Sequence, residues 1–212
     1  MTRVSILRFV ADDWQSVSPV SGTELLDALD RADASGNTTE LRGVPYQWDP
    51  RKGRLPRGDL LTASPPCAPV MSDRARDVLS AALGDQAEFF QVRLDENGDR
   101  AWMLRVPRRL NALAAEKSGI SRNAEDAGGA VSRIGTPCFD EAVLRGVYLF
   151  RLSIAPTFPV MWTDAGVEAV ANARLTAFEF LEVYPHSRSV SAGGVLDLGA
   201  LARSARRREK KK

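Results

Sequence analysis

Two strand patterns joined by a short polar turn limit the possible folds of this chain most strongly. Residues 87–94 and 100–107 are rich in apolar and β-forming side chains, and the segment between them contains Asn97-Gly98. Asn-Gly favours the positive φ angles of a tight turn, so the two segments are predicted to pair as an antiparallel hairpin. A hairpin in the middle of the chain argues against a purely parallel, doubly wound sheet.

The clearest helix pattern comes directly before this hairpin. Ser72 is in position to cap the helix, Asp73 follows in its first turn, and Gly84 ends it. Apolar residues between them recur at helical spacing, at Ala75, Val78, Leu79, Ala82 and Leu83. The sequence therefore predicts an amphipathic helix over residues 73–83.

Strand and helix patterns are interleaved along the rest of the chain. Strands are predicted over 3–10, 59–64, 146–154, 159–162 and 177–185, and helices over 23–32, 108–117 and 164–173. Either Ser21 or Thr23 caps the first of these helices, and Thr163 caps the last, whose Val167, Val170 and Ala171 share one face. The predicted class is α+β, a mixed and largely antiparallel sheet with two or three amphipathic helices packed on it.

The remaining segments are predicted to be irregular. Residues 40–58 contain many glycine, proline and charged residues and would be held by Tyr46 and Trp48, while residues 123–130 form a surface loop. No repeat of about 20–50 residues is evident, although residues 59–94 and 149–183 faintly share an order of strand, Pro-Val-Met, helix and strand.

Three parts of the chain are expected. Residues 1–58 form a strand and helix segment packed on the main body, residues 59–185 form the α+β domain, and residues 186–212 form a linker and a basic tail. The tail residues 203–212 hold seven basic residues and one acidic residue, which leaves 22 basic against 26 acidic residues elsewhere, a net charge of −4. The tail is a solvated terminus or a salt-sensitive contact to nucleic acid.

The chain shows no sign of export or of a catalytic motif. The first 15 residues lack a signal-peptide pattern, and no run of 18 apolar residues could span a membrane. Cys67 and Cys138 are isolated, which is more typical of a reduced, cytoplasmic protein than of a disulfide scaffold.

His186 is the single histidine and lies in the predicted linker, and neither zinc-ligand spacing nor a glycine-rich phosphate loop is present. We predict no enzyme, cofactor or metal site, with an uncharacterised hydrolase as an alternative.

Five short segments carry a family pattern. They are two helix starts, at Val70–Asp73 and Trp162–Asp164, and three strands, at Phe89–Leu94, Tyr148–Leu152 and Leu175–Val183. Spread over residues 58–184, they resemble the immunity protein family found beside bacterial polymorphic toxins, the eleventh in that series and formerly an uncharacterised domain. The sequence departs from the family pattern at residues 102–104, at residues 113–118, where only Ser118 is kept, and at Ala177, where a glycine is common.

The resemblance implies a protein that binds and blocks a cognate toxin inside the producing cell, without catalysis. Many such toxins act on nucleic acid and are basic, and an acidic body would attract them. Candidate contacts are side chains in or beside predicted loops: Trp14, Tyr46, Trp48, Asp95, Glu96, Asp99, Trp162 and Asp164. Trp48 and Trp162 have a second interpretation as covers over the edge of the core, and the hairpin acids as simply solvated.

Overall fold

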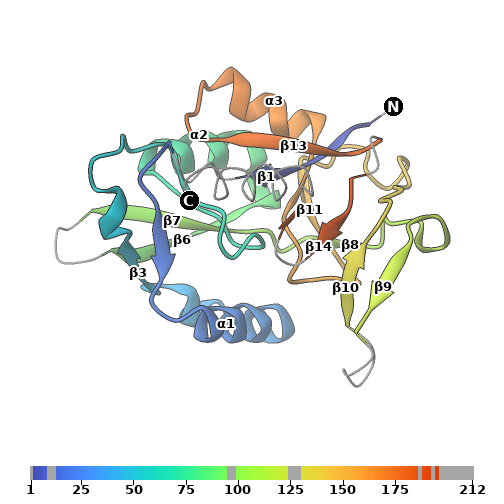
Figure 1. The fold of residues 1–212 in the computed structure, drawn as a ribbon, viewed down its shortest axis with the longest axis horizontal. Helices are drawn as coiled ribbons and strands as arrows, with labels where there is room; N and C mark the ends of the chain where they lie inside the picture. Colours follow the sequence, from blue (N-terminus) through green and yellow to red (C-terminus); the bar gives the residue numbers. More distant parts are fainter. Residues whose placement is uncertain are drawn as a thin grey trace, which may run out of the picture.

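The computed structural model describes residues 2–8, 13–94, 99–123, 130–185, 188–191 and 194–195. Within these ranges the chain forms three α-helices and three β-sheets with mixed, mostly antiparallel pairing (Figure 1). The predicted α+β class is confirmed.

The strand β1 (Val4–Arg8) lies inside a five-stranded sheet. It pairs antiparallel with β12 (Met161–Thr163) on one side and with β13 (Glu179–Tyr184) on the other. β11 (Leu149–Leu152) pairs antiparallel with β12, and β8 (Arg109–Leu110) pairs parallel with β11 at the edge. The sheet order is therefore β13-β1-β12-β11-β8, which places an early segment of the chain between two late ones.

The predicted hairpin is the centre of a six-stranded sheet. Its two strands pair antiparallel from Glu88–Arg105 to Arg93–Arg100, and the turn residues Asn97-Gly98 lie outside the described residues. The sheet order is β2 (Val17–Pro19), β3 (Pro45–Trp48), β6 (Glu88–Leu94), β7 (Arg100–Arg105), β5 (Val70–Met71) and β4 (Leu60–Thr62). Because β3 belongs to this sheet, the prediction that residues 40–58 are irregular is wrong in part.

A small antiparallel sheet covers one face of the five-stranded sheet. Its strands are β9 (Ile120–Arg122), β10 (Val131–Ile134), β14 (Val190–Ser191) and β15 (Gly194–Val195). Val131, Ile134 and Val190 pack into one core cluster with Phe150 and Met161 of the five-stranded sheet. The predicted linker after residue 186 is therefore partly a strand, since burial of Val190 fixes β14 against β10.

Helices cover both faces of the six-stranded sheet (Figure 1). α1 (Gly22–Ser35) buries Leu25 and Leu29 against Phe90, Val92 and Met103. α2 (Asp73–Leu83) and α3 (Asp164–Asn172) lie on the opposite side and share a core cluster that includes Leu104 and Trp162. Four 3₁₀ turns complete the described elements: η1 (Thr39–Leu41), η2 (Pro50–Lys52), η3 (Gly84–Gln86) and η4 (Ala115–Lys117).

The local helix signals are largely confirmed. The Ser72 hydroxyl accepts a hydrogen bond from the backbone N–H of Ala75 at 3.1 Å, and Ser21, rather than Thr23, caps α1 by accepting from Glu24 N–H at 3.3 Å. Thr163 occupies the cap position of α3, but its hydroxyl donates instead to the backbone carbonyl of Val147. Ala171 is exposed, so it does not share the buried face of α3.

The helix predicted over residues 108–117 is wrong. Residues 109–110 form β8, residues 115–117 form η4, and Ala112 and Leu113 are buried in the core between them. Residues 112–114 instead hydrogen-bond to residues 138–140, with a bridge between Leu113 and Phe139, and such tertiary contacts outweigh the weak helix propensity of the segment.

Two parts of the chain share one topology. In each, an antiparallel strand pair (β4–β5 or β11–β12) is followed by a helix and then by a strand two places further along the sheet (β6 or β13). A further antiparallel strand fills the gap, β7 in one sheet and β1 in the other. The faint sequence similarity between residues 59–94 and 149–183 thus corresponds to a structural one.

The closest approach of α3 to the sheet depends on Gly166. A methyl group at this position would overlap the backbone carbonyl oxygen of Tyr148, which cannot rotate away, and would lie 3.1 Å from the Trp162 ring.

Gly166→Ala is expected to lower the free energy of unfolding by about 1–3 kcal/mol, measured by urea denaturation. Gly22→Ala is the matched control, since nothing lies within 4 Å of its added methyl group. Equal stability of the two variants would contradict this account.

Candidate partner-binding surface

The two faces of the hairpin have different environments. Along β6, Phe90, Val92 and Leu94 are buried toward α1, and the alternation of a strand turns Phe89, Gln91 and Arg93 to the opposite face. The register places Trp102 opposite Gln91 and Arg100 opposite Arg93, so these two β7 residues share that face. Phe89 and Trp102 pack at the margin of the α2 core cluster, and beyond them the face is open.

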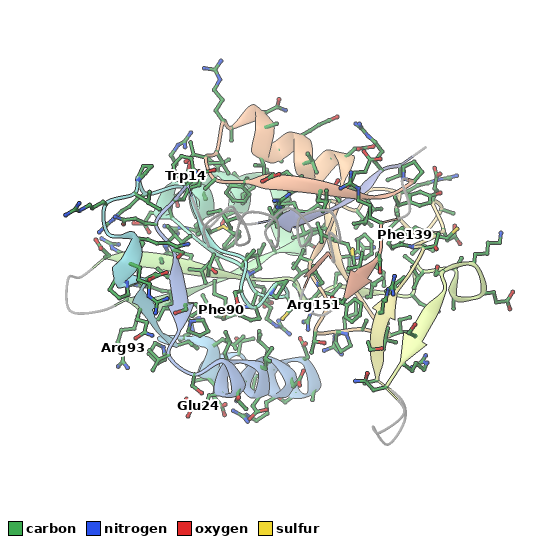
Figure 2. The ribbon with its side chains drawn as sticks, in the orientation of Figure 1. Trp14, Glu24, Phe90, Arg93, Phe139 and Arg151 are labelled. Carbon is green, nitrogen blue, oxygen red and sulfur yellow. The ribbon has the colours of Figure 1, made fainter. Side chains whose placement is uncertain are left out.

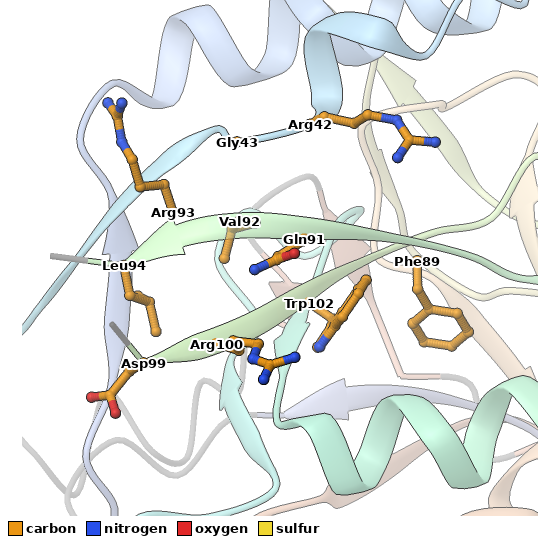
Figure 3. Close-up of a pocket in the computed structure, with 10 residues that line it drawn as sticks. All are labelled: Arg42, Gly43, Phe89, Gln91, Val92, Arg93, Leu94, Asp99, Arg100 and Trp102. Carbon is orange, nitrogen blue, oxygen red and sulfur yellow. The ribbon is translucent and has the colours of Figure 1, made fainter. Parts of the chain in front are cut away.

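An open groove of about 400 Å³ lies over this face of the hairpin. We call it the arginine groove and define it by Arg42, Phe89, Gln91, Arg93, Arg100 and Trp102. Figure 3 shows that Arg42 comes from the loop before β3, whereas the other five come from the hairpin. The groove thus joins segments about 50 residues apart into one surface.

Trp102 is held in a fixed orientation within the groove. Its indole N–H donates to the Asp73 carboxylate at 2.5 Å, and the Arg76 guanidinium lies 4.2 Å from the centre of its ring. Both partners belong to α2, and a stacked cation adds to the packing of an aromatic ring. The groove therefore has a rigid aromatic wall that would lose little conformational entropy on binding.

The charges of the groove are unbalanced. In the described part of the chain, no carboxylate forms an ion pair with Arg42, Arg93 or Arg100. Asp99 also lines the groove, but its carboxylate lies 3.0 Å from the guanidinium of Arg57. Arg93 and Arg100 are directly opposite each other, and like charges in that position destabilise a sheet.

A buried ion network supports the hairpin from its other side. Asp33 of α1 has a side chain only 4% exposed and accepts hydrogen bonds from Arg105 at 2.8 Å, from Arg151 at 2.6 Å and from Arg109. Arg105 also contacts the Glu88 carboxylate at 2.5 Å. The network ties α1 to β6 and β7 of one sheet and to β8 and β11 of the other, with Arg151 deep inside the molecule (Figure 2).

The network determines the ionisation of Asp33. Burial by itself would raise the pKa of this carboxyl group, but the charge of Arg151 and the hydrogen bonds from Arg109, Arg151 and Arg105 outweigh it. The pKa of Asp33 therefore lies below its ordinary value of 3.8, and the side chain is a carboxylate at neutral pH.

The environment of Cys67 argues against nucleophilic chemistry at this residue. Cys67 is buried and Cys138 half-buried, and both are free thiols. Burial raises the pKa of the Cys67 thiol to about 11, so it is protonated at neutral pH.

Among the described residues, no three histidine, cysteine or acidic side chains come together as a metal site. In the same part of the chain, each helix is too short or too polar to cross a membrane.

One protein-family model matches most of the chain. The model of the Immunity protein family (Imm11) matches residues 19–185. The chain belongs to this family. The match contains every residue of the arginine groove and of the Asp33 network, and it begins well before residue 58, where the sequence resemblance begins. No curated protein matches the chain.

In this Imm11 protein, one departure from the pattern that the resemblance implies lies at a strained backbone position. Ala177 replaces the glycine expected from the resemblance, and its φ angle is +65°. A left-handed conformation costs a residue with a Cβ atom about 1 kcal/mol, whereas glycine adopts it freely. Gly58 packs so closely against Ala177 that a methyl group at residue 58 would overlap the Cβ of Ala177.

The structure brings two of the predicted contact residues together beside the groove. The Arg57 guanidinium lies 4.6 Å from the centre of the Trp48 ring and 3.0 Å from the Asp99 carboxylate. Trp14 is half-buried beside Gly58. Asp164 lies elsewhere, in the first turn of α3, where its carboxylate accepts hydrogen bonds from the backbone and side chain of Arg3.

Two predicted contact residues are not at the surface. Tyr46 is 1% exposed beneath α1, and Trp162 is 0% exposed between α2, α3 and the five-stranded sheet. The expectation that the core leaves these rings free is wrong, because each belongs to a strand whose apolar face is covered. For Trp162, burial agrees with the second interpretation, in which the ring belongs to the core. Asp95, Glu96 and His186 lie outside the described residues.

The arginines of the groove are not among the contact residues predicted from the sequence. Strand alternation in the predicted hairpin places Phe89 and Arg93 on one face, so this part of the surface could have been proposed from the pattern. The position of Arg42 beside the hairpin could not have been proposed from the pattern, because it depends on the parallel pairing of β3 with β6.

Replacing Asp33 tests the ion network. Asp33→Asn is expected to lower the free energy of unfolding by about 3–5 kcal/mol at neutral pH, because buried arginines lose their countercharge. Since the folded-state pKa is lowered, the stabilisation by Asp33 is present above its ordinary value of 3.8 and is lost as the pH falls through the folded value.

Urea denaturation at graded pH measures this difference, which should shrink in acid. The matched control is Glu40→Gln, which breaks the exposed ion pair with Arg31 and should change stability by less than about 1 kcal/mol. A difference between Asp33→Asn and the native chain that stays constant from neutral pH to below 3.8 would contradict the proposed role.

Proposed function

We propose that this Imm11 protein neutralises a cognate bacterial toxin by binding to it in the cytoplasm of the cell that makes both. The observation that carries the proposal is the match of residues 19–185 to the immunity family. Neutralisation by binding requires a rigid, complementary surface rather than covalent chemistry, so we also propose that the protein is not an enzyme.

The arginine groove supports this proposal as the contact surface. Arginine and tryptophan are enriched among the residues that dominate binding energy at protein interfaces. Trp102 is already fixed by Asp73 and Arg76, and the strands beneath the groove are tied to α1 through Arg105 and Asp33. Preorganised groups of this kind bind with a smaller entropic cost than mobile ones.

Co-expression tests the proposal. The toxic domain encoded by the gene beside this one should stop growth of a host cell, and simultaneous expression of the full chain should restore growth. The purified chain and toxic domain should also form a complex by size-exclusion chromatography. Failure of the chain both to restore growth and to bind would reject the immunity function.

Removing the basic tail separates this function from an association with nucleic acid. A chain that ends at residue 202 loses seven basic residues and one acidic residue. If the toxin binds the folded body, the shortened chain should protect cells as well as the full chain does. Loss of protection, together with loss of a salt-sensitive affinity for RNA, would favour the tail as the functional element.

A further inference from the structure

We propose that the arginine groove binds an acidic segment of the partner protein, with Asp or Glu carboxylates bound between Arg93, Arg100 and Arg42. This inference rests on the proposed function and specifies the chemistry of the partner at this surface. It depends on three observations about the described residues: the charge of the groove, the cost of keeping that charge, and the shape of its walls.

The charge is positive and available. Some other arginines of the described surface form ion pairs, namely Arg31 with Glu40 at 2.6 Å, Arg74 with Asp59 at 2.6 Å and Arg57 with Asp99 at 3.0 Å. Others in the described part of the chain do not, among them the exposed Arg145 and Arg188, but these are not gathered in one groove with further arginines. In the same part of the chain, the three groove arginines have no such carboxylate partner, and all three are exposed. Guanidinium groups bind carboxylates and phosphates through paired, charge-assisted hydrogen bonds, so the groove is suited to an anionic ligand.

The positive charges of Arg93 and Arg100 also destabilise the hairpin that carries them. Arg93 and Arg100 are direct cross-strand neighbours, and a single acidic residue at either position would turn repulsion into attraction. Residues that break a local stability rule are expected to concentrate at functional sites. The pair is therefore better explained by binding than by the stability of the hairpin.

The walls favour a protein segment over a nucleic acid. Nucleic acids are commonly held by stacking of bases on open aromatic rings. Arg76 covers Trp102 at 4.2 Å and Asp73 holds the edge of its indole, so the ring is already engaged on the α2 side. Gln91 and Phe89 add one amide and one apolar contact, which suits an extended peptide with mixed polar and apolar side chains.

Charge reversal tests the inference with purified protein and the toxic domain of the neighbouring gene. The double variant Arg93→Glu/Arg100→Glu should bind that domain about 100-fold more weakly than the native chain, because repulsion replaces attraction. Arg145→Glu/Arg188→Glu is the matched control, since it changes the net charge equally at two exposed arginines outside the groove. The control should bind as the native chain does.

A single variant separates binding from folding. Arg93→Glu should unfold at the same urea concentration as the native chain or a higher one, because the introduced carboxylate would face Arg100, yet it should bind the toxic domain more weakly. A merely structural role of Arg93 would give the opposite result, with lower stability and unchanged binding.

Each outcome decides between the proposals. Equal binding by the native chain and the double variant would overturn the acidic-segment inference and leave the immunity function intact. No binding by the native chain would overturn both. A groove-dependent affinity for a short labelled RNA, in place of the toxic domain, would overturn the protein-segment inference in favour of a nucleic acid.

Discussion

The carboxylate of Asp33 joins α1 to both of the larger sheets. Three guanidinium groups converge on it, and two of them, Arg105 and Arg151, have side chains only 7% and 2% exposed. Buried arginines without a countercharge would destabilise the fold by several kcal/mol. The arrangement fixes α1 against the hairpin, and the hairpin in turn carries most of the arginine groove. The surface we assign to binding is therefore supported by an interaction on the opposite face of the same strands.

The sequence predicts the features that depend on neighbouring residues, and it does not predict those that depend on residues far apart in the chain. Ser72, the apolar stripe of α2 and the two strands of the hairpin are defined by neighbours in the chain, and all appear in the structure as expected. β8 and β14 form because distant strands pair with them, and local propensity contains no sign of those partners. The Asp33 network connects residues separated by 72, 76 and 118 positions, so no local pattern could indicate it.

The residues of the candidate binding surface also depend on contacts that the sequence does not reveal. The aromatic residues chosen as surface anchors included Tyr46 and Trp162, which are among the largest fully buried side chains. A tryptophan near a predicted strand end can face the core or the solvent, and the sequence does not distinguish the two. The groove arginines are conspicuous only when the register places Arg93 opposite Arg100 and the pairing of β3 with β6 brings Arg42 into the same groove. Net charge was also a poor guide, since a body with net charge −4 outside its tail presents a local concentration of positive charge.

The position of β1 has a consequence for the order of folding. Every residue of this strand pairs with residues of β12 or β13 that lie more than 150 positions later in the chain. During translation Ile6 has no sheet partner until residues 161–184 have been made, so the five-stranded sheet closes late. A chain whose synthesis stops before residue 161 lacks both strands that pair with β1, and its buried face stays uncovered.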